Sequence, residues 1–356
     1  MGLIQRIGNL ARRSVSQPDL ETVLETIEGL ANRGRRIEAL RYGCDHAMRI
    51  DDLALWARLG QLRMEAVPEA VAASHPRADW PPSLEDPFPD AASPPEIDAA
   101  SLNWRILGGA ILHHGSLIVR NLFEPAAVAR LRDEIDTALG TCIDFYADPP
   151  KAVASSAYLP FDLPLDAPLN HGRGWTQASG AVWAIESPRV FEMLAALYRS
   201  RGVLDAIAGY LGEKPVLSVG KTVLRRSEPN TGGDFHQDGA FMGTGIRTVN
   251  VWTALSDCGV DAPGLEVVGR RLSRIVETGT RGACFHWSAG REVAEETAKP
   301  ASIVTPIFKA GDALIFDQLM LHSTYTTPAM TKRRYAIESW FFAPSFHAEN
   351  QIPLVI

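Results

Sequence analysis

A histidine and an aspartate stand two residues apart in the segment 234–241, which reads DFHQDGAF. Successive side chains of a β-strand point to opposite faces, so a strand over 233–238 places His236 and Asp238 side by side and turns Gln237 away. An imidazole and a carboxylate on one face are two candidate metal ligands. A histidine in a strand is also commonly a hydrogen-bonded packing residue, so the pair alone leaves both interpretations open.

The best candidate for a third ligand is His322. The segment 311–322 reads GDALIFDQLMLH, in which an apolar strand leads through a polar turn to a histidine at the start of another strand. Two histidines and one carboxylate on one face of an octahedron leave three positions open, as in non-haem Fe(II) oxygenases. Those positions can take a chelating cosubstrate and O2. His236, Asp238 and His322 are therefore the predicted metal ligands and catalytic centre.

The elements that must position these residues are short strands. From about residue 100 the chain consists of short β-rich runs bounded by Gly, Asn and Pro, which favours an all-β core with helices around it. A strand is predicted over 115–120, and helices from 124 to about 139 and over 191–211. Eight further strands are predicted at about 216–226, 233–238, 246–255, 264–268, 303–308, 313–316, 320–325 and 334–342. Such a series fits a double-stranded β-helix, the cupin-like jelly-roll barrel.

The first part of the chain differs from this pattern. Apolar residues at helical spacing over 18–65 predict two or three helices, with Asp51 and Asp52 at the start of the last one. The stretch from Pro68 to Pro95 is rich in proline, which disfavours regular structure. We therefore predict an N-terminal helical region over 1–67, a proline-rich linker over 68–99 and an oxygenase domain over 100–356 that carries the whole site.

Composition excludes several classes of partner. The 356 residues carry a formal net charge of −7, and without a stripe of Lys and Arg a nucleic-acid partner is not expected. No apolar run is long enough for a membrane span. The four cysteines are scattered without a C-x-x-C pair, which favours a reducing compartment, so we predict a cytoplasmic protein. The sequence does not define the oligomeric state.

The chain resembles the phytanoyl-CoA dioxygenase family of Fe(II)/2-oxoglutarate oxygenases over about residues 105–343. No single segment is decisive, but their joint order and spacing make the resemblance strong. In chain order the matching segments are 117–123 (LIVRNLF), 210–212 (YLG), 235–241 (FHQDGAF), 251–257 (VWTALSD), 264–269 (GLEVVG), 311–322 and 334–341 (RYAIESWF).

The resemblance implies a role for further residues. His236, Asp238 and His322 would ligate Fe(II), and an arginine eleven or twelve residues after the last histidine would pair with the far carboxylate of 2-oxoglutarate. The residues that follow this arginine in the family match the residues after Arg334, so the resemblance aligns Arg334 with it. The planar guanidinium of an arginine matches the two oxygens of a carboxylate. Arg333 adjoins Arg334, and only one of the two can point inward from a strand. Thr324 stands where the family often has a hydroxyl that contacts the same carboxylate, although it could equally be an ordinary strand residue.

Four more residues could line the cosubstrate pocket, although residues of these types also serve packing alone in strands. They lie on the strands before and after the H-x-D segment: Lys221, Thr222, Asn250 and Trp252. The chain departs from the family at Ser323, where a glycine is common, and in the segments 262–264 and 268–271. The change at Ser323 affects the turn. The two segments do not touch the ligands, but they leave the substrate open.

The predicted function is oxidation of a small-molecule or carrier-linked substrate, with succinate and CO2 as coproducts. Related halogenases lack the carboxylate ligand, so Asp238 favours hydroxylation or desaturation. The alternative is a non-redox member of the jelly-roll class, either a cupin-like metal-dependent isomerase or a small-molecule-binding protein, which would not need an inward arginine. The N-terminal helices are a candidate surface for dimerisation or for docking a carrier.

Overall fold

Two β-sheets form the centre of the computed structural model, which describes residues 17–91, 94–148, 153–163, 167 and 169–356. The major sheet has the order β1-β2-β10-β6-β12-β4-β13, with β3 also paired to β4, and the minor sheet has the order β8-β5-β11-β7-β9. The strands of the major sheet are β1 (Glu96–Asp98), β2 (Ser116–Arg120), β3 (Ala181–Trp183), β4 (Val216–Ser227), β6 (Thr248–Ala254), β10 (Ala313–Phe316), β12 (Arg334–Phe342) and β13 (Pro353–Val355). Those of the minor sheet are β5 (Phe235–His236), β7 (Gly264–Val268), β8 (Ser288–Ala289), β9 (Ile303–Val304) and β11 (His322–Tyr325).

The inner core lies between the two sheets. Trp252, Phe316 and Trp340 of the major sheet share one apolar cluster with Leu265 and Val267 of the minor sheet. The alternate residues of the major sheet, such as Ile337 and Phe341 of β12, belong to a second cluster on its outer face. This period-two division between an inner and an outer face is what a two-sheet barrel requires. The predicted jelly-roll fold with added helices is confirmed.

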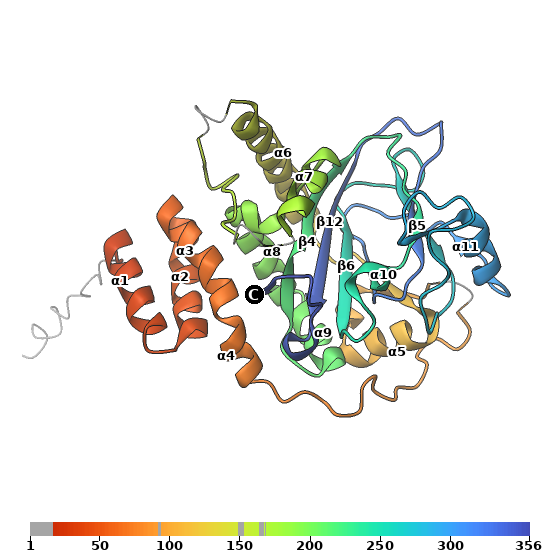
Figure 1. The fold of residues 1–356 in the computed structure, drawn as a ribbon, viewed down its shortest axis with the longest axis horizontal. Helices are drawn as coiled ribbons and strands as arrows, with labels where there is room; N and C mark the ends of the chain where they lie inside the picture. The colour runs from red at the N-terminus through yellow and green to blue at the C-terminus, as the bar shows by residue number, and fades with distance from the viewer. Residues whose placement is uncertain (1–16, 92–93, 149–152, 164–166, 168) are drawn as a thin grey trace, which may run out of the picture.

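Helices cover the outer face of the major sheet (Figure 1). They are α5 (Trp104–His114), α6 (Pro125–Ala147), α8 (Pro188–Ser200) and α9 (Val203–Leu211). The helical region predicted over 191–211 is two helices, because Gly202 between them has a left-handed backbone with φ 70°. Three further helices are α7 (Leu169–Ala178), α10 (Gly239–Met242) and α11 (Arg291–Ala298). In the described part of the chain, no helix is long and apolar enough to cross a membrane.

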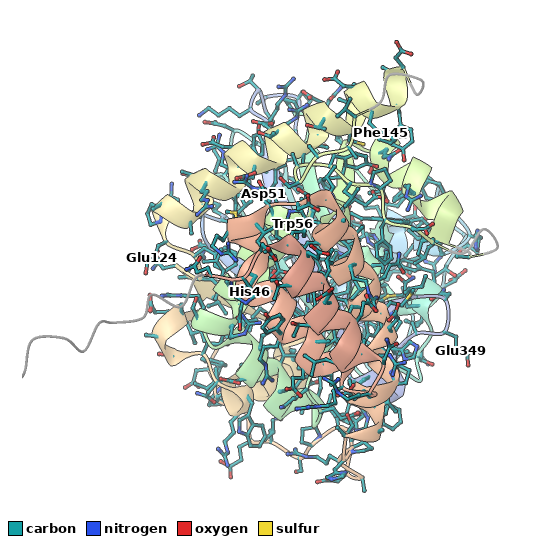
Figure 2. All side chains as sticks on the ribbon, turned by 90° about the vertical axis from the view of Figure 1, so that its left-hand side faces the viewer. His46, Asp51, Trp56, Glu124, Phe145 and Glu349 are labelled. Carbon is teal, nitrogen blue, oxygen red and sulfur yellow. The ribbon has the colours of Figure 1, made fainter. Side chains whose placement is uncertain are left out.

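The N-terminal helices pack on this helical layer, on the side away from the minor sheet (Figure 1). They are α1 (Leu20–Ala31), α2 (Arg36–Ile50), α3 (Leu53–Glu65) and α4 (Val67–Ala72). As predicted, Asp52 caps α3, where its side chain accepts a hydrogen bond from the amide of Ala54 at 2.8 Å. In Figure 2 the N-terminal helices face the viewer, with Asp51 and Trp56 near the start of α3.

Arg63 of α3 joins the N-terminal helices to the rest of the chain. Its guanidinium pairs with Glu192 of α8 and donates to the carbonyl oxygen of Val355 at 2.8 Å. Only 3% of the Arg63 side chain and 15% of the Glu192 side chain is exposed. The two predicted regions therefore meet through a buried ion pair, and the predicted division into domains stays a prediction.

The proline-rich segment is less irregular at its ends than predicted. Pro68 lies in the first turn of α4, where a proline costs no helical hydrogen bond. At the other end, β1 lies within the predicted linker and pairs with β2 in parallel. Between Ala72 and Glu96, the described residues form neither helix nor strand.

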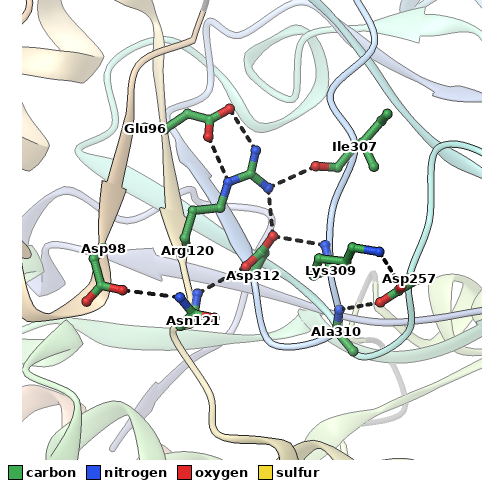
Figure 3. Close-up of polar contacts among 9 residues, drawn as sticks. All are labelled: Glu96, Asp98, Arg120, Asn121, Asp257, Ile307, Lys309, Ala310 and Asp312. Atoms are coloured by element: carbon green, nitrogen blue, oxygen red, sulfur yellow. Dashed lines mark hydrogen bonds and ion pairs between the residues drawn. The ribbon is translucent and has the colours of Figure 1, made fainter.

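The start of β10 is fixed by a polar cluster around Asp312 (Figure 3). Asp312 accepts from the Arg120 guanidinium at 2.6 Å and from the backbone amides of Asn121 and Lys309 at 3.0 and 2.9 Å. Gly311 has φ 100°, and a Cβ there would collide with the carbonyl oxygen of Phe123. The Gly-Asp pair of the segment 311–322 is therefore needed for the turn into β10, which leads toward His322.

Candidate metal and cosubstrate site

The structure brings the three predicted ligands together. His236 and His322 are direct partners in the pairing of β5 with β11, and their ring centroids are 4.4 Å apart. One potential ligand atom from each of His236, Asp238 and His322 lies within 4.8 Å of the others. The described residues contain no other group of three such ligand residues. Two imidazoles and one carboxylate thus converge at one place on the minor sheet.

Asp238 reaches this cluster by a different route from the one predicted. The strand ends at His236, and Asp238 is the residue that precedes α10, with a helical backbone at φ −61° and ψ −25°. The amide of Met242 donates to the Asp238 carbonyl at 2.9 Å, which closes the helical turn. The prediction of a strand over 233–238 is wrong beyond His236, because the chain turns into a helix at Gly239.

Gln237 points away from the cluster, as the period-two pattern predicts. Only 1% of this residue is exposed. Its amide nitrogen donates to the carbonyl oxygens of Arg274 and Leu319 at 3.0 and 2.7 Å. Its amide oxygen accepts from the Val276 amide at 2.8 Å. The residue between the two ligands therefore ties the turn before His322 and the loop over 274–276 to β5.

Backbone carbonyl groups orient both histidine rings. Nδ1 of His236 lies 2.9 Å from the Asp234 oxygen, and Nδ1 of His322 lies 3.0 Å from the Met320 oxygen. A carbonyl oxygen can only accept, so Nδ1 carries the proton in each ring and Nε2 keeps its lone pair for a metal. Burial, and then the neighbouring His236, lower the pKa of His322 to about 4.

Asp238 is held in its charged form. Burial alone would raise the pKa of this carboxyl group, but Lys221 and the two histidines outweigh it and lower the pKa. The Lys221 ammonium lies 3.4 Å from the carboxylate, and its side chain comes from β4 of the opposite sheet. Two imidazoles with free Nε2 atoms and one carboxylate anion are a donor set that fits Fe(II).

Arg334 fits a carboxylate ligand. It begins β12, it is 3% exposed, and it donates to the Gly264 carbonyl at 3.0 Å and the Ser227 hydroxyl at 3.2 Å. Its Nε atom has no hydrogen-bond partner, and no acid among the described residues forms an ion pair with it. Burial lowers its pKa to about 10. A buried guanidinium without an acid partner is costly, so this position suits an incoming anion.

Arg333 faces the other way. Its side chain is 52% exposed and pairs with Glu228 at 2.9 Å. The structure therefore places Arg334, and not its neighbour, on the inner face of β12. Trp252 lies on the inner face as well, with its ring 5.6 Å from the Arg334 guanidinium carbon.

The remaining predicted residues divide between the two faces. Asn250 pairs with Phe316 and Trp340 of the inner core, and its side-chain oxygen accepts from the Ser339 amide at 3.3 Å. Thr324 shares the inner face of β11 with His322, two residues away. The structure does not bring Thr222 to the cluster.

Thr222 lies opposite Ser339 in the β4–β12 pairing. The Ser339 hydroxyl accepts from Tyr198 of α8 at 2.8 Å, so this pair of residues faces the helical layer. Lys221 and Thr222 are neighbours in a strand and cannot both point inward. We therefore leave Thr222 out of the proposed pocket.

Two inner residues were missed in the sequence. Arg225 of β4 donates through Nε to Glu338 of β12 at 3.1 Å, and its other nitrogen reaches the Ser179 hydroxyl at 3.2 Å. Burial would raise the pKa of Glu338, but Arg225 and Lys221 lower it. Arg225 lies four residues after Lys221 and Glu338 four residues after Arg334, so charges at an even spacing in apolar strands were the available signal.

Comparisons with known proteins identify the family of the chain. The family model described as Phytanoyl-CoA dioxygenase (PhyH) matches residues 111–334. No curated protein matches the chain. Among solved structures, EctD from S. alaskensis with 2-oxoglutarate and 5-hydroxyectoine is 18% identical, with 78% of this chain and 85% of that chain covered and a TM-score of 0.47. EvdO2 from Micromonospora carbonacea var. aurantiaca, complexed with 2-oxoglutarate, is 16% identical, with 65% and 88% covered and a TM-score of 0.45.

A third structure, AviO1 from Streptomyces viridochromogenes Tue57, is 17% identical, with 69% of this chain and 97% of that chain covered and a TM-score of 0.43. The family match spans most of the chain, from α5 to the first residue of β12, and it contains the three clustered residues and Arg334. The chain therefore belongs to the phytanoyl-CoA dioxygenase family of Fe(II)/2-oxoglutarate oxygenases.

Proposed function

We propose that this protein is a dioxygenase that hydroxylates a small-molecule or carrier-linked substrate, with succinate and CO2 as coproducts. One observation carries the proposal. The cluster of His236, Asp238 and His322 on the minor sheet shares the barrel interior with Arg334 of the major sheet, which is buried and has no acid partner among the described residues. A metal-binding cluster with a separate carboxylate-binding group is the combination that a 2-oxo acid cosubstrate needs.

The residues divide the work as follows. His236, Asp238 and His322 hold the iron, and Arg334 binds the far carboxylate of 2-oxoglutarate. Lys221, Asn250, Trp252 and Thr324 line the cosubstrate pocket. When bound, iron and 2-oxoglutarate supply the oxidation, in which O2 gives one oxygen atom to succinate and the other to the hydroxylated substrate.

The protein's own contribution is to fix charge and protons. The carbonyl oxygens of Asp234 and Met320 keep the proton on Nδ1 of each ring. Lys221 keeps Asp238 ionised, and this carboxylate occupies a ligand position that a halogenase would leave for chloride. Apolar rings such as Trp252 and Phe316 exclude water from the interior. These features favour hydroxylation.

The alternative function is a non-redox cupin-like isomerase or a small-molecule-binding protein. Such a protein could use the same metal ligands, but it would gain nothing from a buried guanidinium at position 334. The missing partner at Nε of Arg334 therefore supports the oxygenase.

Metal stoichiometry tests the proposal. Purified protein is expected to bind one Fe(II), and Asp238→Ala to weaken binding markedly, because two neutral imidazoles remain on a dication. Asp261→Ala is the matched control, since this acid is 59% exposed and pairs with Lys332 away from the cluster. Equal iron content in the wild type and His236→Ala, measured by elemental analysis, would overturn the ligand assignment.

A further inference from the structure

Three aromatic side chains lie together beside the candidate metal site: Phe241, Phe285 and Trp287. The rings of Phe285 and Trp287 are stacked, with centroids 4.8 Å apart and 3° between their planes. Phe241 meets Trp287 edge to face at 5.4 Å. Trp287 also meets the ring of His236 edge to face at 5.7 Å. This aromatic cluster therefore extends from an iron-ligand candidate outward.

The backbone fixes the aromatic cluster relative to the metal ligands. Phe241 lies in α10, which starts directly after Asp238. Trp287 directly precedes β8, which pairs with β5 so that Ser288 faces His236. The Ser288 hydroxyl donates to the Asp234 carboxylate at 2.8 Å. The same elements that hold the ligands thus hold the rings.

Phe241 packs against the inner core, but the other two rings of the cluster do not. Phe285 is 46% exposed. Neither it nor Trp287 belongs to an apolar core cluster among the described residues. Large apolar side chains that remain exposed next to a functional site are typical of ligand-binding surfaces. Binding of an aromatic ring against these side chains would be stabilised by burial of apolar surface and by contacts between the rings.

The charges next to the cluster select against cations. The Lys221 ammonium already lies over the face of Phe241, 4.1 Å from the ring centroid. Among the described residues, it is also the only lysine or arginine that forms an ion pair with Asp238. A positively charged ligand in the same space would face both this ammonium and the metal dication. The faces of aromatic rings can attract a cation, but the charges around this cluster favour a ligand without positive charge.

We propose that the aromatic cluster binds a planar apolar ring of the primary substrate, and that this ring carries no positive charge. The inference rests on the proposed function, because it places the substrate beside the iron. Phe285 and Trp287 are specificity-determining residues, and Phe241 with Lys221 closes the site to cations.

Ligand-observed NMR on the full chain tests this inference. Mn(II) replaces Fe(II), 2-oxoglutarate is added, and the probes are 2-naphthol, which is planar and neutral, and trimethylphenylammonium, which is aromatic and cationic. A probe beside the metal has its proton lines broadened by Mn(II). We expect broadening of 2-naphthol with the wild type, binding roughly tenfold weaker in Trp287→Ala and Phe285→Ala, and little broadening of the cation.

Phe285 is exposed, so Phe285→Ala keeps the test valid if Trp287→Ala does not fold. Tyr146→Ala is the matched control, since Tyr146 is 45% exposed and lies on α6, away from β5 (Figure 1). Water-proton relaxation reports Mn(II) binding separately. If Mn(II) does not bind, the proposed function fails and this inference fails with it. If Mn(II) binds but both alanine variants bind 2-naphthol like the wild type, or the cation binds as tightly, only this inference fails.

Discussion

Arg333 and Arg334 are neighbours in the sequence with opposite surroundings. One is half exposed and paired with Glu228, and the other is buried without an acid partner. The sequence alone leaves both as candidates for the cosubstrate, because the register of β12 is not visible in it. The pairing of Arg334 with Ser227 sets that register, and the choice follows from it.

Arg334→Ala is expected to raise the apparent KM for 2-oxoglutarate by a factor on the order of 10²–10³, since removing one partner of a buried charge pair costs about 2–5 kcal/mol. Arg333→Ala, the matched control, should change it little. Steady-state succinate release at varied 2-oxoglutarate measures both. The reverse order of effects would mean that the inner face of β12 is assigned wrongly.

Sequence patterns predicted some of the candidate site. The H-x-D spacing and the position of His322 predicted the three clustered residues. The route to Asp238 was missed, because Gly239 starts a helix where a strand was expected. Thr222 was included because a residue's face depends on register. These misses share a cause, which is that side-chain direction is set by tertiary pairing.

At the scale of elements, Gly311 determines how β10 begins. Gly311→Ala is expected to destabilise the protein by about 1–3 kcal/mol, since alanine resists the left-handed backbone and its Cβ would meet the Phe123 carbonyl. Gly140→Ala in α6 is the control, because nothing lies within 4 Å of its Cβ and alanine favours a helix. Urea unfolding measures both. A Gly311→Ala variant as stable as Gly140→Ala would contradict this explanation of the motif.

Glu186, in the short 3-10 helix Ala184–Glu186 after β3, joins α7 to the segment before it. Its carboxylate pairs with Arg173 of α7 at 2.8 Å and accepts from the Phe161 amide at 3.2 Å. Burial raises its pKa from 4.5 to about 7, although Arg173 opposes the shift, and Tyr158 and Cys142 also lie near it. The folded protein therefore holds this proton more tightly than the unfolded chain.

The stability that this proton contributes is fully present below pH 4.5 and is lost as the pH rises through about 7. Glu186→Gln is expected to flatten the pH dependence of the unfolding free energy across this range. Urea unfolding between pH 5 and 8 measures the slopes. Parallel curves for the wild type and the variant would show that Glu186 does not titrate in this range.

Element types were predictable where the apolar period was clear. The predicted strands over 216–226, 264–268, 313–316 and 334–342 match β4, β7, β10 and β12 closely. The strand over 303–308 shortens to β9, because Pro306 has no amide to donate. Helices such as α7 and α11 had no predicted counterpart, since they are short and tertiary contacts decide them.

At the scale of the molecule, a buried ion pair joins the N-terminal helices to the rest of the chain. Arg63→Ala would leave Glu192 without its partner, which typically costs about 3–5 kcal/mol. Arg35→Ala is the control, because the pair of Arg35 with Glu38 is exposed. Calorimetry measures the effect. A single transition that shifts as a whole would count against separate domains, and two transitions would support the division at 68–99.

Composition predicted that the chain changes character near its proline-rich stretch, but not how the parts meet. The charges of Arg63 and Glu192 are 129 residues apart in the chain, and no local pattern links them. Contacts of this kind are specified by the folded surface, so the sequence predicted the helices and not their packing on α8.

The central claim is that one site holds Fe(II) and 2-oxoglutarate. Anaerobic titration of the full chain with both, followed by visible absorption, tests it most directly, because the chelate has a weak charge-transfer band. We expect the band in the wild type and in His46→Ala, whose histidine lies on α2 (Figure 2), and its loss in His236→Ala. No band in the wild type, or an equal band in His236→Ala, would contradict the account.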